Sequence, residues 1–134
     1  MKLSSKTITA IKMFIDLGEH YEEGFISLID IAKRKDLSKK FLEQIVPAYK
    51  NIGLIIGSRG NQGGYRLAKA PHEITLKDII YVSENNLLKD NVDDQAINNM
   101  LNDIDNLLDD YLNKMTLTKL IEKEKESYSN DYCI

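Results

Sequence analysis

Residues 53–68 constrain the fold of this chain more than any other stretch. They read Gly-Leu-Ile-Ile-Gly-Ser-Arg-Gly-Asn-Gln-Gly-Gly-Tyr-Arg-Leu-Ala, so two short apolar runs flank a polar tip that has glycine at both ends. Glycine tolerates positive φ and weakens the interior of a strand, and this pattern is typical of a β-hairpin. By itself the pattern also fits an ordinary surface hairpin with a solvated arginine.

Three amphipathic helices are predicted upstream of the hairpin. Ser4 is a good N-cap, and the apolar residues after it predict a helix over about 4–21. Ser27 should cap a second helix and Ser38 a third, over about 39–51. A helix pair followed by a hairpin with a basic tip is the plan of a winged-helix nucleic-acid reader.

The third helix contains a proline, and a fourth helix is predicted after the hairpin. Pro47 removes one hydrogen bond inside the third helix and should kink it or weaken its second half. Thr75 caps a fourth helix that should reach about Ser83, and residues 84–92 are expected to form a loop.

A long helix over about 93–115 follows, because its apolar residues step by four and three in turn. The members of this seam are Ile97, Leu101, Ile104, Leu108, Tyr111 and Met115. A narrow seam of period 3.5 favours pairing with a second copy of the chain, although so long a helix can instead span its own domain. A short helix over 117–126 and a polar tail over 127–134 are predicted to end the chain.

The predicted fold is mainly α with a small β-hairpin wing. A winged helix-turn-helix domain should occupy residues 1–83, and the loop, dimerisation helix, short helix and tail should form one unit over 84–134. The 134 residues are 43% hydrophobic, with no apolar run near the ~18 residues of a membrane span and no secretory signal at the start. These features predict a cytoplasmic protein.

The charge is divided unevenly along the chain. Residues 1–69 carry 12 Lys and Arg against 7 Asp and Glu, a net of +5, whereas residues 70–134 carry a net of −8, which together give the −3 of the whole chain. Such a division predicts a basic half that meets a polyanion and an acidic half turned away from it, unless it reflects chance clustering and an acidic tail.

Enzyme chemistry is not predicted. The only histidines, His20 and His72, have no cysteine or paired carboxylate at ligand or triad spacing, and no phosphate-binding loop motif is present. Cys133 is the only cysteine, so one chain can form neither a disulfide nor a cysteine-ligated metal site. We expect no cofactor and no metal.

Nearly the whole chain resembles the Rrf-two family (Rrf2) of bacterial winged-helix regulators. The matching motifs are Met1-Lys2-Leu3-Ser4, Ser27-Leu28, Ile31-Ala32, Leu37-Ser38, Leu42-Glu43-Gln44, Gly53-Leu54, Arg59-Gly60, Gly63-Gly64-Tyr65-Arg66-Leu67-Ala68, Ile74-Thr75, Asp78-Ile79, Thr116-Leu117 and Leu120. The resemblance implies a homodimer that grips a palindromic operator in double-stranded DNA and acts as a transcription regulator, usually a repressor. The alternative is a winged-helix protein–protein interaction module without sequence-specific DNA binding.

The expected DNA contacts lie on the third helix and the hairpin. Ser38, Lys39, Lys40, Glu43 and Gln44 stand at the start of the recognition helix, where side chains reach base edges. Glu43 can accept from cytosine N4 and Gln44 can bridge adenine N6 and N7, and the resemblance makes Glu43 a base reader. The alternative for Glu43 is an ordinary helix pair with Lys39 or Lys40.

The hairpin and two further positions should contact the DNA backbone and minor groove. Arg59 is expected to enter the minor groove, which attracts arginine where A·T-rich segments narrow it. The N–H groups around Gly60 and the Tyr65 hydroxyl can reach phosphates, as can Lys50 and the helix start at Ser27.

The chain departs from the cluster-binding members of the family. Those members carry three cysteines in the loop before the dimer helix, and residues 84–92 contain none. Iron–sulfur sensing is therefore not implied. Within the family the cluster-free cysteine-metabolism repressor is the nearer likeness, so control of sulfur metabolism is expected. Tyr132, Cys133 and Ile134 then form a candidate partner-binding tail for cysteine synthase, or else a frayed end with no role.

Overall fold

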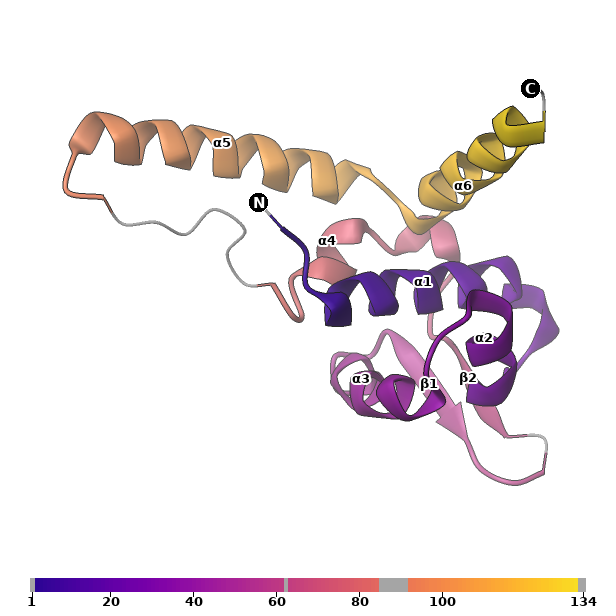
Figure 1. Cartoon of the computed structure of the whole chain (residues 1–134). Helices are drawn as coiled ribbons and strands as arrows, with labels where there is room; N and C mark the ends of the chain where they lie inside the picture. Colours follow the sequence, from indigo (N-terminus) through magenta and orange to yellow (C-terminus); the bar gives the residue numbers. More distant parts are fainter. Residues whose placement is uncertain (1, 62, 85–91, 133–134) are drawn as a thin grey trace.

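The N-terminal part of the chain is built from capped helices and one hairpin. The computed structural model describes residues 2–61, 63–84 and 92–132, with the side chains of 129–132 left out (Figure 1). The first four α-helices are α1 (Ser5–Glu19), α2 (Leu28–Lys35), α3 (Lys39–Asn51) and α4 (Leu76–Ile80), with single 3₁₀ turns at Tyr21–Glu23 and Pro71–Glu73. The predicted caps are all in place, because each of the side chains of Ser4, Ser27, Ser38 and Thr75 accepts a hydrogen bond from a backbone N–H three residues later.

The hairpin pairs β1 (Ile55–Ser58) with β2 (Gly64–Leu67) in an antiparallel register that sets Ile55 opposite Leu67. A third segment joins it, since the N–H and C=O of Ile26 both bond Tyr65 at 2.8 Å. This approach requires glycine at position 64, where a Cβ would lie 2.3 Å from the carbonyl oxygen of Ile26. The sequence pattern around Ile26 does not predict this third segment.

The core lies between α1, α3, α4 and the hairpin. Phe14 and Tyr49 meet edge to face at its centre, with ring centroids 4.9 Å apart. The Tyr49 hydroxyl donates a hydrogen bond to the carbonyl of Ile79 at 2.8 Å, and burial raises the pKa of Tyr49 to about 12. Helix α3 continues through Pro47 without a break, held by the buried side chains of Val46 and Tyr49 on either side.

The C-terminal part consists of α5 (Gln95–Lys114) and α6 (Leu117–Tyr132). Helix α5 extends away from the body of the molecule, while α6 returns to pack against α1 (Figure 1). A short backbone bridge fixes the turn between them, because Leu117 N–H donates to Ile74 and Leu76 N–H to Met115, each at 2.8 Å. Residues from both sides of the predicted boundary at 83/84 share one core, so that boundary stays a prediction.

The end of the chain differs from the prediction. Helix α6 continues to Tyr132 instead of ending near 126, so the stretch predicted as a tail is helical up to that residue. Residues 122–132 contain no glycine or proline, which leaves nothing in the sequence to stop the helix. Cys133, Ile134 and most of the predicted loop, residues 85–91, lie outside the described residues. No helix in the described part is long and apolar enough to cross a membrane.

Candidate nucleic-acid interface

Helix α3 buries one face and exposes the other. Leu42, Ile45, Val46 and Tyr49 are buried against the core. The predicted DNA-contacting residues Lys39, Lys40, Glu43 and Gln44 are exposed on the opposite side of the first two turns. This is the arrangement that a recognition helix needs, because its buried stripe fixes the helix while its polar stripe is free to meet base edges.

Glu43 forms a local ion pair with Lys39. Its Oε1 lies 3.4 Å from Lys39 Nζ, and both side chains are about half exposed. An exposed helix pair of this kind contributes little stability, so Glu43 can exchange Lys39 for a base donor at small cost. This pair is the alternative role expected for Glu43, and its base-reading role stays a prediction.

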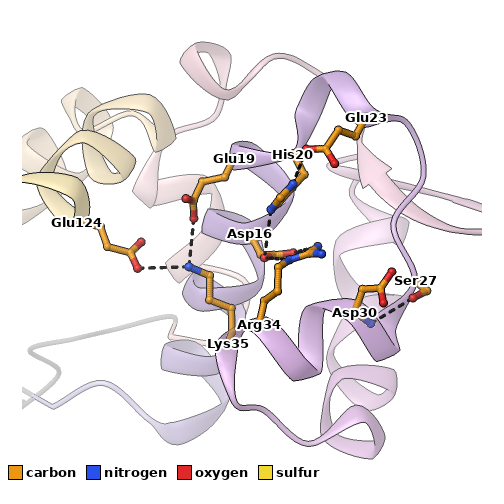
Figure 2. Close-up of polar contacts among 9 residues, drawn as sticks. All are labelled: Asp16, Glu19, His20, Glu23, Ser27, Asp30, Arg34, Lys35 and Glu124. Carbon is orange, nitrogen blue, oxygen red and sulfur yellow. Dashed lines mark hydrogen bonds and ion pairs between the residues drawn. The ribbon is translucent and has the colours of Figure 1, made fainter. Parts of the chain in front are cut away.

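Helix α2, whose N-terminus carries Ser27, is fixed to α1 by an ion pair. Arg34 donates through Nε and Nη2 to the two carboxylate oxygens of Asp16, both at 2.8 Å, and this hydrogen bonding raises the pKa of Arg34 (Figure 2). The Asp16 side chain is only 2% exposed. A buried carboxylate needs such a bidentate partner, and the pair sets the position of α2 in the helix-turn-helix. In the sequence, the only indication of this ion pair is the single aspartate between the apolar Ile15 and Leu17.

The hairpin is attached to the end of α3 through Tyr65. Its ring lies beside Gly57, where a Cβ would be 3.2 Å from the ring, and Lys50 Nζ stands 5.9 Å from the ring centroid. Arg59 and Gly60 are exposed beyond this contact, and Gly60 has a φ of +106° that only glycine adopts easily. The structure therefore brings Lys50, Tyr65 and the wing together on one side of the molecule.

The structure adds Arg66 to the candidate contacts. Arg66 is exposed on β2, and its guanidinium lies 5.4 Å from the ring of Phe25, which precedes α2. Alternation along the strand places Arg66 and the buried Leu67 on opposite faces, and this signal was available in the sequence. The helix α3 and the hairpin that carry these basic residues lie at the end of the molecule opposite α5 (Figure 1).

Helix α5 exposes a row of apolar side chains along its length. The exposed members are Ile97, Met100, Ile104, Leu107 and Tyr111. Of the predicted seam, Leu101 and Leu108 are partly buried, and Met115 is only 8% exposed because it caps α5 inside the core. Met115 was therefore wrongly placed in an exposed seam, and the exposed apolar row includes Met100 and Leu107 instead.

The environment of His20 also differs from the prediction. Its ring contacts the carboxylate of Glu23 and lies 3.9 Å from that of Asp16, so it does have acidic neighbours (Figure 2). These contacts join the end of α1 to the turn that follows. The part of the chain described by the structure contains no group of three or more His, Cys, Asp or Glu side chains placed to hold a metal ion.

Comparison with known proteins gives a consistent result. The family model described as "Rrf2: Iron-dependent Transcriptional regulator" matches residues 3–123. The HTH-type transcriptional regulator CymR of Bacillus subtilis is 42% identical over 84 residues, which are 63% of this chain and 61% of CymR. The regulator IscR of Pectobacterium carotovorum is 28% identical over 134 residues, covering 93% of this chain and 82% of that protein.

Solved structures of the same two kinds are similar to this chain. The structure of CymR (YrzC), the global cysteine regulator of B. subtilis, has a TM-score of 0.83 and 33% identity over 92% of this chain and 98% of its own. The structure of T. potens IscR has a TM-score of 0.81 and 33% identity, and the match covers 95% of this chain and 90% of that one. The sequence match spans only 61% of CymR and 56% of the protein rrf2 of Nitratidesulfovibrio vulgaris.

Proposed function

Because this chain belongs to the Rrf2 family of transcriptional regulators, we propose that it is a homodimeric repressor that binds a palindromic operator in double-stranded DNA. The observation that carries this proposal is the position of its two exposed surfaces. The polar face of α3 and the hairpin lie at one end of the molecule, and the apolar row of α5 lies at the other (Figure 1). Two copies joined along α5 would present two α3 helices to one duplex.

The charges of the DNA-facing surface support this use. Lys39, Lys40, Lys50, Arg59 and Arg66 are all exposed on α3 and the hairpin. Phosphate contacts by such side chains supply affinity, and contacts by Glu43 and Gln44 to base edges would supply specificity. The hairpin then serves as a wing, with Arg59 directed to the minor groove.

Selection from random duplexes tests the proposed function directly. Purified protein is expected to enrich one palindromic sequence and to retard it in a gel at lower concentration than a scrambled duplex of equal length. A protein that enriches no sequence would contradict the operator proposal. A winged-helix module that binds only proteins would give that result.

The family description names iron, and the residues of this chain do not fit an iron–sulfur cluster. Such clusters are held by several cysteine thiolates, and Cys133 is the only cysteine among the 134 residues. The loop 84–92 supplies Glu, Asn, Leu, Lys, Asp and Val side chains and no thiol. We therefore propose that this regulator works without an iron–sulfur cluster.

Control of sulfur or cysteine metabolism is part of the same proposal. It is supported by the similarity to CymR in sequence and in fold. The expected role of Tyr132, Cys133 and Ile134 in binding cysteine synthase stays a prediction. Tyr132 ends α6, and the other two residues lie outside the described part of the chain.

A further inference from the structure

Lys35 joins three helices at the turn of the helix-turn-helix. Its Nζ lies 3.1 Å from Glu19 on α1 and 3.3 Å from Glu124 on α6, and its side chain is only 17% exposed (Figure 2). Burial opposes the charge of Lys35, but the two carboxylates outweigh it, so the pKa of Lys35 is raised. Lys35 is also the last residue of α2, directly before the turn that leads into α3.

The turn beyond Lys35 is short and has little freedom. Asp36 is the only non-glycine residue in the described chain with a positive φ, and the Leu37 N–H bonds back to Ala32 at 2.9 Å. Ser38 then caps α3 through the N–H of Phe41. Only two residues therefore separate the Lys35 anchor from the cap of the recognition helix, so the position of Lys35 constrains where α3 begins.

Helix α6 contacts α1 directly near its start and borders a cleft farther along. Near the start, α1 and α6 touch at Gly18, where a Cβ would lie 2.7 Å from Ile121 Cδ1. Farther along, an open cleft of about 510 Å³ separates the helices and is lined by Ile15, Leu120, Lys123, Glu124, Ser127 and Tyr128. Beside this cleft, the ion pair between Glu124 and Lys35 is the polar contact that joins α6 to the helix-turn-helix within the described residues.

The link is incompletely satisfied on the α6 side. Glu124 Oε2 is buried and has no hydrogen-bond partner in the described residues, and one ammonium serves two carboxylates. A carboxylate oxygen without a donor is costly unless water reaches it, and the side chains of Glu124 and Glu19 are similarly exposed, at 26% and 32%. This part of α6 therefore relies on Lys35 for its polar contact with the helix-turn-helix.

We propose that Glu124 is a positioning residue for DNA binding: through Lys35 it fixes the turn between α2 and α3, so the docking of α6 sets the affinity of the recognition helix for DNA. Helix α6 follows α5 directly, so the pair connects the dimerisation helix to the DNA-facing end of the molecule. The DNA part of this inference rests on the proposed function, and the effect on the turn does not.

Hydrogen exchange of the DNA-free protein tests the effect on the turn. Glu124→Gln should raise exchange of the amides of residues 36–42 at least threefold, and Glu126→Gln on the same helix should leave them unchanged. Glu126 is exposed and has no ion pair in the described residues. The Glu126→Gln control therefore removes the same charge from α6 as Glu124→Gln without removing the contact to Lys35. Glu124→Asp, which withdraws the carboxylate from Lys35 by one methylene, should act like Glu124→Gln. Unchanged exchange over 36–42 in both Glu124 variants would overturn the proposal, even if exchange in α6 rose.

A double-mutant cycle tests the effect on DNA affinity. On a duplex enriched by selection, Glu124→Gln should weaken binding at least threefold relative to Glu126→Gln, and should have no further effect in a Lys35→Met background. Lys35→Arg, which keeps the charge, should bind like the wild type. Additive effects of Glu124→Gln and Lys35→Met would overturn the coupling to DNA. If the wild type binds no DNA, the proposed function fails, while hydrogen exchange still decides whether Glu124 positions the turn.

Discussion

Replacing Leu107 on the exposed row of α5 should dissociate the dimer without unfolding the chain. Leu107 is 72% exposed in the single chain, so a glutamate there meets water and leaves the core intact. Full burial of a leucine side chain stabilises by about 1.5–3 kcal/mol. Because Leu107 is mostly exposed in the single chain, each of the two copies can gain most of this free energy when the dimer forms. Leu107→Glu should therefore weaken association by about 2–4 kcal/mol, roughly 30- to 1,000-fold in the dimer dissociation constant.

Sedimentation equilibrium at micromolar concentration measures this change. The matched control is Asn102→Glu, which adds the same charge to α5 five residues earlier and on a different side of the helix. The control should remain dimeric, and both variants should keep the helical circular dichroism of the wild type. Equal dissociation of the two variants, or a Leu107→Glu dimer of wild-type affinity, would refute the reasoning that the exposed row is the dimer surface.

Three further outcomes are expected. Glu43→Ala should relax the base preference at one operator position by ~1–3 kcal/mol in selection experiments, and an unchanged selected sequence would leave the Lys39 pair as the only role of Glu43. Burial raises the pKa of Tyr49 to about 12 in the folded state, so the folded state keeps the phenolic proton up to a higher pH than the unfolded state does. The free energy of unfolding should therefore fall between about pH 10 and pH 12, by up to ~3 kcal/mol. Urea titrations should show this fall in the wild type and a smaller one in Tyr49→Phe. Anaerobically purified protein should contain almost no iron or acid-labile sulfide, and stoichiometric amounts of both would contradict a cluster-free regulator.

The sequence predicts most of the architecture because its local signals agree with the packing. The caps at Ser4, Ser27, Ser38 and Thr75 each precede an apolar stripe at helical spacing, and all four helices begin there. The glycines at both ends of the tip in 53–68 likewise predict the hairpin. These signals lie within a few residues of each other, so they can be read without tertiary contacts.

What the sequence does not predict depends on contacts between distant residues. The bridge from Ile26 to Tyr65 and the ion pair from Arg34 to Asp16 join segments far apart in the chain. A heptad step cannot tell which apolar side chains of a helix face the core of the same chain, so Met115 was wrongly assigned to the dimer seam. The length of α6 was missed because a polar sequence without breakers fits both a helix and a tail.

The salt dependence of operator binding tests the central claim most directly. Fluorescence anisotropy on a selected duplex should give an affinity that falls steeply with salt, and Arg59→Ala should reduce the slope of log K against log salt by about one. Lys119→Ala, at the exposed start of α6 and outside the cleft beside Glu124, is the matched control and should leave the slope unchanged. Binding that does not respond to salt, or an Arg59→Ala slope equal to that of the wild type, would contradict the assignment of α3 and the wing as the DNA-binding surface.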